Sequence, residues 1–82
     1  SWFMFDLGIA VQNISLTAHD LGLGTVVVGS LDHEKCARLL NVKDPYELVV
    51  ILPVGKPVEF KKEGPKRREI SEFTHKDKFG NK

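Results

Sequence analysis

The sequence predicts an α+β fold that these 82 residues do not complete on their own. A helix predicted over residues 6–21 lacks the charged face of a surface helix, and a strand predicted over residues 46–52 is apolar on both faces. A strand of that kind needs neighbouring strands and two covering layers. The chain supplies only one more extended piece and one more sizeable helix. We therefore expect helices packed on a mixed sheet that a missing segment or a partner chain completes.

The first predicted helix is apolar or mildly polar nearly all round. No Lys, Arg, Asp or Glu stands between Asp6 and Asp20, whereas surface helices normally carry a charged face. Gly22 stands where a left-handed residue is expected to end the helix. We expect this helix to be buried on most sides. Its main stripe has helical spacing and consists of Leu7, Ala10, Val11, Ile14, Ala18 and Leu21.

A short extended segment and a second helix follow. Residues 26–28 are three valines between glycines, a composition typical of a strand. Ser30 or Asp32 can cap a helix that reaches to about Leu40, because their side-chain oxygens accept from free N–H groups at a helix start. Asn41 is expected to close that helix.

The second half begins with the strongest strand signal of the chain. Residues 46–52 form a near-continuous apolar run, and Pro53 limits pairing at its far end. Residues 55–57 are expected to turn. Ile70 and Phe73 stand three apart, which predicts one helical turn over residues 71–75. Residues 76–82 are expected to be a frayed tail, and the whole of residues 1–82 to be one partial domain.

Composition excludes several classes of protein. The hydrophobic fraction is 41%, and no stretch approaches the ~20 apolar residues of a membrane span, so no membrane partner is expected. The single cysteine excludes an internal disulfide, and the three histidines lack zinc-site spacing. Residues 1–6 have no basic region, so they do not predict a signal peptide and read like a chain entered partway through. These features favour the cytoplasm.

The charge is divided unevenly along the chain. Residues 1–55 carry three Lys/Arg and six Asp/Glu, a balance of −3, and residues 56–82 carry nine and five, a balance of +4. The basic surplus therefore lies in the tail. Nucleic-acid binding is not expected there, because the basic patch is short and acidic residues interrupt it.

Four stretches follow one another along the chain and together span nearly all of residues 2–80. They are Asp6–Asn13 with Leu16–Ala18, then Leu21–Gly29, Leu48–Pro57 and Lys66–Phe73. In this order they resemble the nitroreductase family of FMN-dependent oxidoreductases. The family's amino-terminal half, which carries further flavin-binding motifs, has no counterpart here, and Glu69 stands where the family often has Pro.

The resemblance implies a homodimer with FMN at the subunit interface and the first helix packed between the subunits. It implies that NAD(P)H reduces the flavin by hydride transfer and leaves, after which a nitroaromatic, quinone or similar acceptor is reduced in its place. These 82 residues alone are expected to be inactive. The alternative is a non-catalytic remnant or accessory subunit that dimerises without flavin, and a small unrelated interaction domain is a third interpretation.

Three residues are matched by the resemblance to the loop that lies against the isoalloxazine ring: Val27, Val28 and Gly29. Extended backbone beside a glycine can approach a flat ring, and its amides can tune a flavin. The structural alternative is a buried strand that ends at a helix cap.

Arg67 and Arg68 match the family's basic residues that reach the FMN phosphate, with Arg67 ahead of Arg68 and Lys66 as a substitute. Guanidinium groups suit phosphate because they bind it with two parallel hydrogen bonds. The alternative is a solvated basic tail. No catalytic or metal-binding residue is predicted.

Other polar and aromatic residues have structural interpretations. Gln12 and Asn13 are expected to make hydrogen bonds across a helix interface, and His19 to interact with the negative end of its own helix. Cys36 is expected to pack as a small hydrophobe, and Trp2 to cover an interface rather than stack on a flavin.

Overall fold

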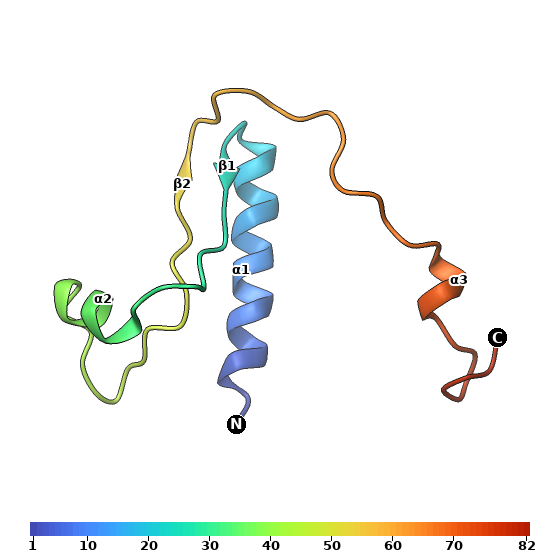
Figure 1. The fold of residues 1–82 in the computed structure, drawn as a ribbon, viewed down its shortest axis with the longest axis horizontal. Coiled ribbons are helices and arrows are strands. Elements are labelled where there is room, and N and C mark those ends of the chain that lie inside the picture. The colour runs from blue at the N-terminus through green and yellow to red at the C-terminus, as the bar shows by residue number, and fades with distance from the viewer.

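The computed structural model describes residues 1–82 and places one long helix beside a short antiparallel ribbon. A small helix lies at one end of the ribbon, and an extended arm leaves the other end and carries a last helical turn (Figure 1). The elements in chain order are α1 (Phe3–Asp20), β1 (Gly24–Thr25), α2 (His33–Leu39), β2 (Val54–Gly55) and α3 (Ile70–Phe73).

Helix α1 confirms the first predicted helix and begins three residues earlier than expected, at Phe3. It ends in a paired hydrogen-bond motif. The N–H of Leu23 donates to the carbonyl of Ala18 at 2.8 Å, and that of Gly22 donates to His19 at 3.0 Å. This arrangement requires a left-handed residue after the helix, and Gly22 has φ +78°. The motif turns the chain back along α1, so that β1 runs beside the helix.

The ribbon pairs β1 with β2 in antiparallel register, with Gly24 opposite Gly55 and Thr25 opposite Val54. Pairing resumes where Val28 and Ile51 exchange two backbone hydrogen bonds of 2.9 and 3.0 Å. The valines are therefore extended, as predicted. The strand predicted over residues 46–52 is wrong in its extent: only Ile51 pairs, and β2 begins after it. Residues 46–50 have no neighbouring strand in this chain, and backbone without a ladder partner gains nothing from a regular strand.

Helix α2 confirms the second predicted helix. Asp32 caps its start by accepting from the N–H of Lys35 at 3.1 Å, and Asn41 follows its end with φ 59°. The ring of His33 lies 2.9 Å from the carbonyl oxygen of Val49. This contact holds α2 against the segment that leads into the ribbon.

Very little of the chain is buried. Ala18 alone is fully buried, and the neighbouring part of α1 is half-covered along Leu7, Val11 and Ser15. The accessible surface is 7818 Å², against about 4,900 Å² for a compact protein of 9.2 kDa. The radius of gyration is 17.2 Å, against about 12 Å for a compact domain of this length. The structure is a partial α+β fold, as predicted.

The arm comprises residues 57–82 and runs clear of the helix and ribbon (Figure 1). Its helical turn, α3, begins at Ile70, one residue earlier than expected. Beyond α3 the chain folds back on itself, with the Gly80 N–H donating to His75 Nδ1 at 2.8 Å. The frayed state of residues 76–82 and the single-domain boundary at 1–82 stay predictions. No helix in the structure has the length and apolar character to cross a membrane.

Replacing Gly22 tests the turn that returns the chain along α1. A Cβ at Gly22 would meet no atom within 4 Å, so the cost of Gly22→Ala comes from its positive φ alone. We expect the free energy of unfolding of the natural full-length protein to fall by about 1–2 kcal/mol, measured by chemical denaturation. Gly64→Ala is the matched control, because Gly64 has equal space and no positive φ. Equal effects of the two substitutions would contradict the role of Gly22.

Candidate functional site

The ribbon exposes unpaired backbone at Val27. Its neighbours bond across the ribbon, Val26 to Pro53 at 3.4 Å and Val28 to Ile51, but neither the N–H nor the C=O of Val27 has a backbone partner. Alternate residues of a strand direct their peptide groups to opposite edges, so those of Val27 face away from β2. The Val27 side chain is 57% exposed. This edge therefore offers one hydrogen-bond donor and one acceptor to a ligand or a further strand.

The three ribbon residues of the predicted site are adjacent but not equivalent. Val28 is half-buried, and both of its backbone groups are used by Ile51. Gly29 is exposed, and a Cβ built on it would meet Val50 at 3.7 Å, an ordinary contact. Within these residues, Val28 is the one whose backbone groups are both used, and neither Val27 nor Gly29 makes a backbone hydrogen bond.

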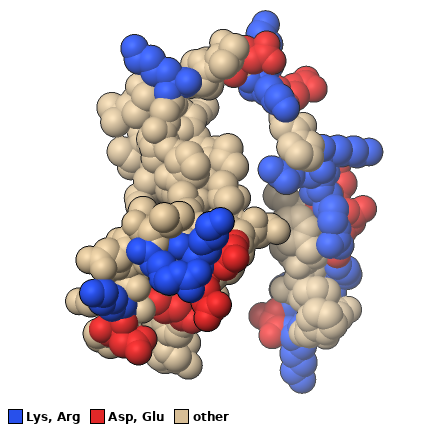
Figure 2. Space-filling model, turned by 60° about the vertical axis from the view of Figure 1, so that its left-hand side comes forward, with Lys and Arg blue, Asp and Glu red and all other residues tan.

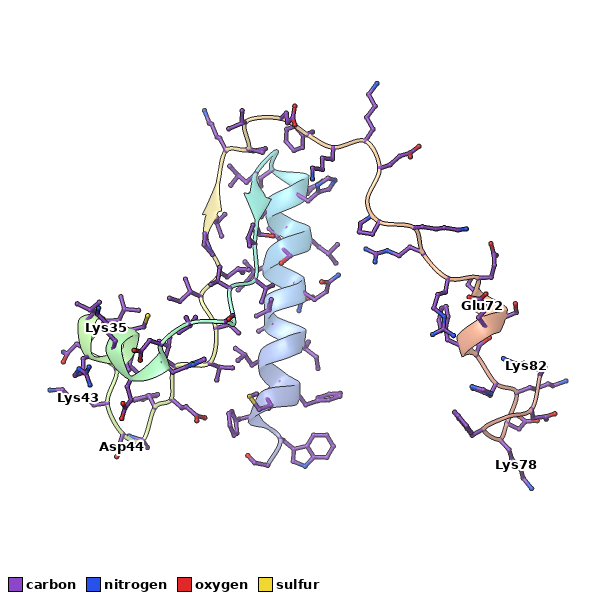
Figure 3. The ribbon with its side chains drawn as sticks, in the orientation of Figure 1. Lys35, Lys43, Asp44, Glu72, Lys78 and Lys82 are labelled. Atoms are coloured by element: carbon purple, nitrogen blue, oxygen red, sulfur yellow. The ribbon has the colours of Figure 1, made fainter.

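The two arginines of the predicted site lie on the arm, in different environments. The Arg68 guanidinium lies over the Phe73 ring, 5.8 Å from its centre, and Nε is 3.4 Å from a carboxylate oxygen of Glu72. Its Nη2 donates to the Glu72 carbonyl at 3.0 Å (Glu72 is labelled in Figure 3). Arg67 has no hydrogen bond or ion pair in the structure. A shallow pocket of about 250 Å³ lies here, lined by Lys66, Arg67, Arg68, Glu69 and Glu72.

The structure does not bring the two parts of the predicted site together within one chain. The ribbon lies along one side of α1, and the arm segment that leads to α3 passes on the other side (Figure 1). A single ligand that used both parts would need the arm and the ribbon from different copies or a different arm position.

The ribbon and the arm also differ in charge. Figure 2 shows charged side chains around α2 and along the arm, with a nearly uncharged surface between them. That surface belongs to α1 and the ribbon, since residues 7–19 contain no Lys, Arg, Asp or Glu. Exposed aromatic and aliphatic residues make it apolar, among them Trp2, which precedes α1, and Phe5, Ile9 and Leu16 on the helix.

An apolar groove that sequence reasoning missed lies between the end of α1 and the ribbon. Its volume is about 370 Å³, and the apolar stripe of α1, which supplies Ile14, Ala18 and Leu21 to the lining, is the sequence signal that could have located it. No group of three or more His, Cys, Asp or Glu is placed to hold a metal. The groove is lined by Asn13, Ile14, Thr17, Ala18, Leu21, Leu23 and Val54.

The remaining sequence candidates lie apart from these features. Gln12 and Asn13 are exposed on α1 and make no side-chain hydrogen bond, so their predicted interface bonds have no partner within this chain. Trp2 packs edge-on against Phe5, with ring centres 5.5 Å apart. Cys36 is half-buried on α2.

Comparison with known proteins identifies the family. The nitroreductase family model matches residues 1–56. A Methanocaldococcus jannaschii protein with a nitroreductase name is 39% identical over 54 residues, covering 66% of this chain and 26% of that protein. An NADPH-dependent oxidoreductase of Staphylococcus epidermidis is 31% identical over 77 residues, covering 90% of this chain and 31% of that protein.

The second match reaches into the arm, because it covers more of the chain than residues 1–56. The chain spans only about a quarter to a third of the length of these curated relatives. Over that span the ordered motifs, the helix–ribbon arrangement and the family match agree. This chain belongs to the nitroreductase family.

Proposed function

We propose that the protein to which these residues belong is an FMN-dependent oxidoreductase. In this proposal NAD(P)H is the electron donor, and a nitroaromatic, quinone or similar small molecule is the acceptor. Membership of the nitroreductase family supports an oxidoreductase role. The printed name of the Staphylococcus epidermidis relative, an NADPH-dependent oxidoreductase, supports the choice of donor. The single reduced thiol favours the cytoplasm as the location.

The observation that carries the proposal is the free peptide edge at Val27. The polar edge of an isoalloxazine ring has both hydrogen-bond donors and acceptors, and the Val27 N–H and C=O have no backbone partner on the edge that faces away from β2. Val28, bonded to Ile51, holds that edge in an extended shape. Gly29 leaves the approach to the backbone open on one side. The free N–H donor and the free C=O acceptor of Val27 therefore fit the polar edge of a flavin ring.

Arg67 fits the phosphate of FMN. Its guanidinium carries no ion pair in the structure, so binding an anion there breaks no existing contact. Charge-assisted bonds to phosphate are among the strongest that a side chain makes. FMN, when bound, supplies the hydride acceptor and donor chemistry. This chain's residues would bind and orient the cofactor.

We also propose that the working protein is a homodimer, built on the uncharged face of α1. The chain exposes about 2,900 Å² more surface than a compact domain of its mass, which exceeds the roughly 1,000–2,500 Å² that each partner buries in an obligate interface. Trp2, Phe5 and Leu16 lie on this exposed face. A second copy would also bring its arm to the ribbon of the first copy, which lies across α1 from the first copy's own arm (Figure 1).

Flavin content tests the proposed function directly. We expect the natural full-length protein to be isolated with bound flavin, identified as FMN by the mass of the released cofactor. NADPH added without oxygen should bleach its visible absorbance, and a quinone should restore it. A folded, colourless protein that takes up no added FMN would contradict the proposal and favour a non-catalytic, accessory role.

Substitution of Arg67 tests the phosphate contact. Arg67→Ala should raise the dissociation constant for FMN by about tenfold to a hundredfold, since bonds to a charged group are worth about 1.5–3 kcal/mol. Riboflavin, which lacks the phosphate, should bind the variant as it binds the wild type. Lys61→Ala, on the same exposed arm, is the matched control and should change neither constant. Titration of flavin fluorescence measures both constants, and equal losses for FMN and riboflavin would place Arg67 outside the phosphate site.

A further inference from the structure

The two adjacent arginines of the arm differ in what their guanidinium groups already contact. Arg68 makes three contacts within the arm: with the Glu72 carboxylate, with the Glu72 carbonyl oxygen and with the face of the Phe73 ring. Arg67 makes no hydrogen bond and no ion pair. An arginine that binds an anion must release whatever its donors already contact. Binding an anion therefore costs Arg68 its existing contacts, whereas it costs Arg67 none.

The contacts of Arg68 all involve α3, a helix too short to be stable alone. It spans only Ile70–Phe73, and a single turn fixes several dihedral angles for few hydrogen bonds. Its end carbonyls need outside donors. Arg68 Nη2 supplies one of these donors, to Glu72, and the Lys82 ammonium supplies others, to the carbonyls of Ser71 and Thr74 (Figure 3). Two cations therefore neutralise the negative end of this turn.

We propose that Arg68 is a positioning residue: it holds α3 in place and leaves the anion to Arg67. The inference rests on the proposed FMN function, and it gives Arg68 a role other than the phosphate contact expected from the sequence. The Lys66–Glu69 segment precedes α3 without a helical turn, and Glu69 is extended, with φ −64° and ψ 143°. When Arg68 holds α3 in place, it also holds the carboxyl end of the Lys66–Glu69 segment. The backbone position of Arg67 is thereby restrained.

The sign of the effect at Glu72 distinguishes this proposal from direct phosphate binding by Arg68. If Arg68 bound the phosphate, Glu72 would compete with the ligand, and Glu72→Ala would tighten FMN binding by removing a nearby anion. If Arg68 holds α3, Glu72→Ala removes the same restraint as Arg68→Ala and weakens FMN binding in the same direction. The contacts are exposed, with 67% and 52% of the two side chains accessible, so the effect is modest.

The test uses the natural full-length protein with Arg68→Ala, Glu72→Ala and the double variant. FMN and riboflavin affinities are measured for each. We expect each single variant to lower the preference for FMN over riboflavin about twofold to fivefold, and the double variant to lower it no further, because both residues act through one restraint. Tighter FMN binding by Glu72→Ala, or additive losses in the double variant, would overturn the proposal.

Amide hydrogen exchange provides a readout that needs no flavin. The N–H groups of Glu72 and Thr74 donate to Glu69 and Ile70 at 2.9 and 3.1 Å, so their exchange reports on α3. Arg68→Ala and Glu72→Ala should speed this exchange about twofold to fivefold, and Arg67→Ala should leave it unchanged. Unchanged exchange in Arg68→Ala overturns the restraint. A protein that binds no FMN would instead overturn the proposed function and the positioning role, while the exchange rates still decide whether Arg68 holds α3.

Discussion

The packing of the ribbon along one stripe of α1 determines where every other element lies. Ala18 is the buried centre of that contact, and its carbonyl accepts the Leu23 N–H that turns the chain back along the helix. A small side chain at this position lets the backbone of β1 come close to α1. Because β1 is fixed in this way, β2 is fixed by pairing, Val27 is left on the outer edge, and the arm departs from the far end of β2. The candidate flavin edge is therefore a consequence of how one helix ends.

The same contact leaves most of the apolar surface uncovered. One stripe of α1 meets the ribbon, while its other faces carry exposed Phe5, Ile9 and Leu16. Large exposed apolar patches on soluble proteins mark surfaces that another element covers. In the proposed homodimer, α1 lies between the subunits, and the basic arm of one copy supplies cations to the ribbon of the other copy. Fold, assembly and cofactor site then depend on the same surface of α1. In this arrangement the uncharged helix forms the interface, and the arm, with nine Lys/Arg after residue 55, supplies the cations.

Local chemistry made much of this fold predictable from sequence. The Gly22 turn, the Asp32 cap and the Asn41 ending each follow from the conformational preference of one residue, and all three occur where expected. The strand over residues 46–52 was overextended because apolar composition reports burial, whereas a strand also requires a neighbour to pair with, and that neighbour is not encoded locally. The separate environments of Arg67 and Arg68 were also beyond sequence reasoning, since they depend on where the Glu72 and Phe73 side chains turn in space. The sequence motif predicted Val27 as a site residue. That its N–H and C=O are unpaired follows only from the register of the ribbon, which the sequence does not reveal.

These 82 residues expose apolar surface that only further residues or a partner can bury. Differential scanning calorimetry of the 82-residue chain alone tests this most directly. We expect no cooperative heat-absorption peak, because a chain with one buried residue has no core to melt. A sharp two-state transition at a concentration where the chain is monomeric, with a heat-capacity increase of about 1.0–1.2 kcal/mol/K as expected for a compact domain of this length, would contradict it.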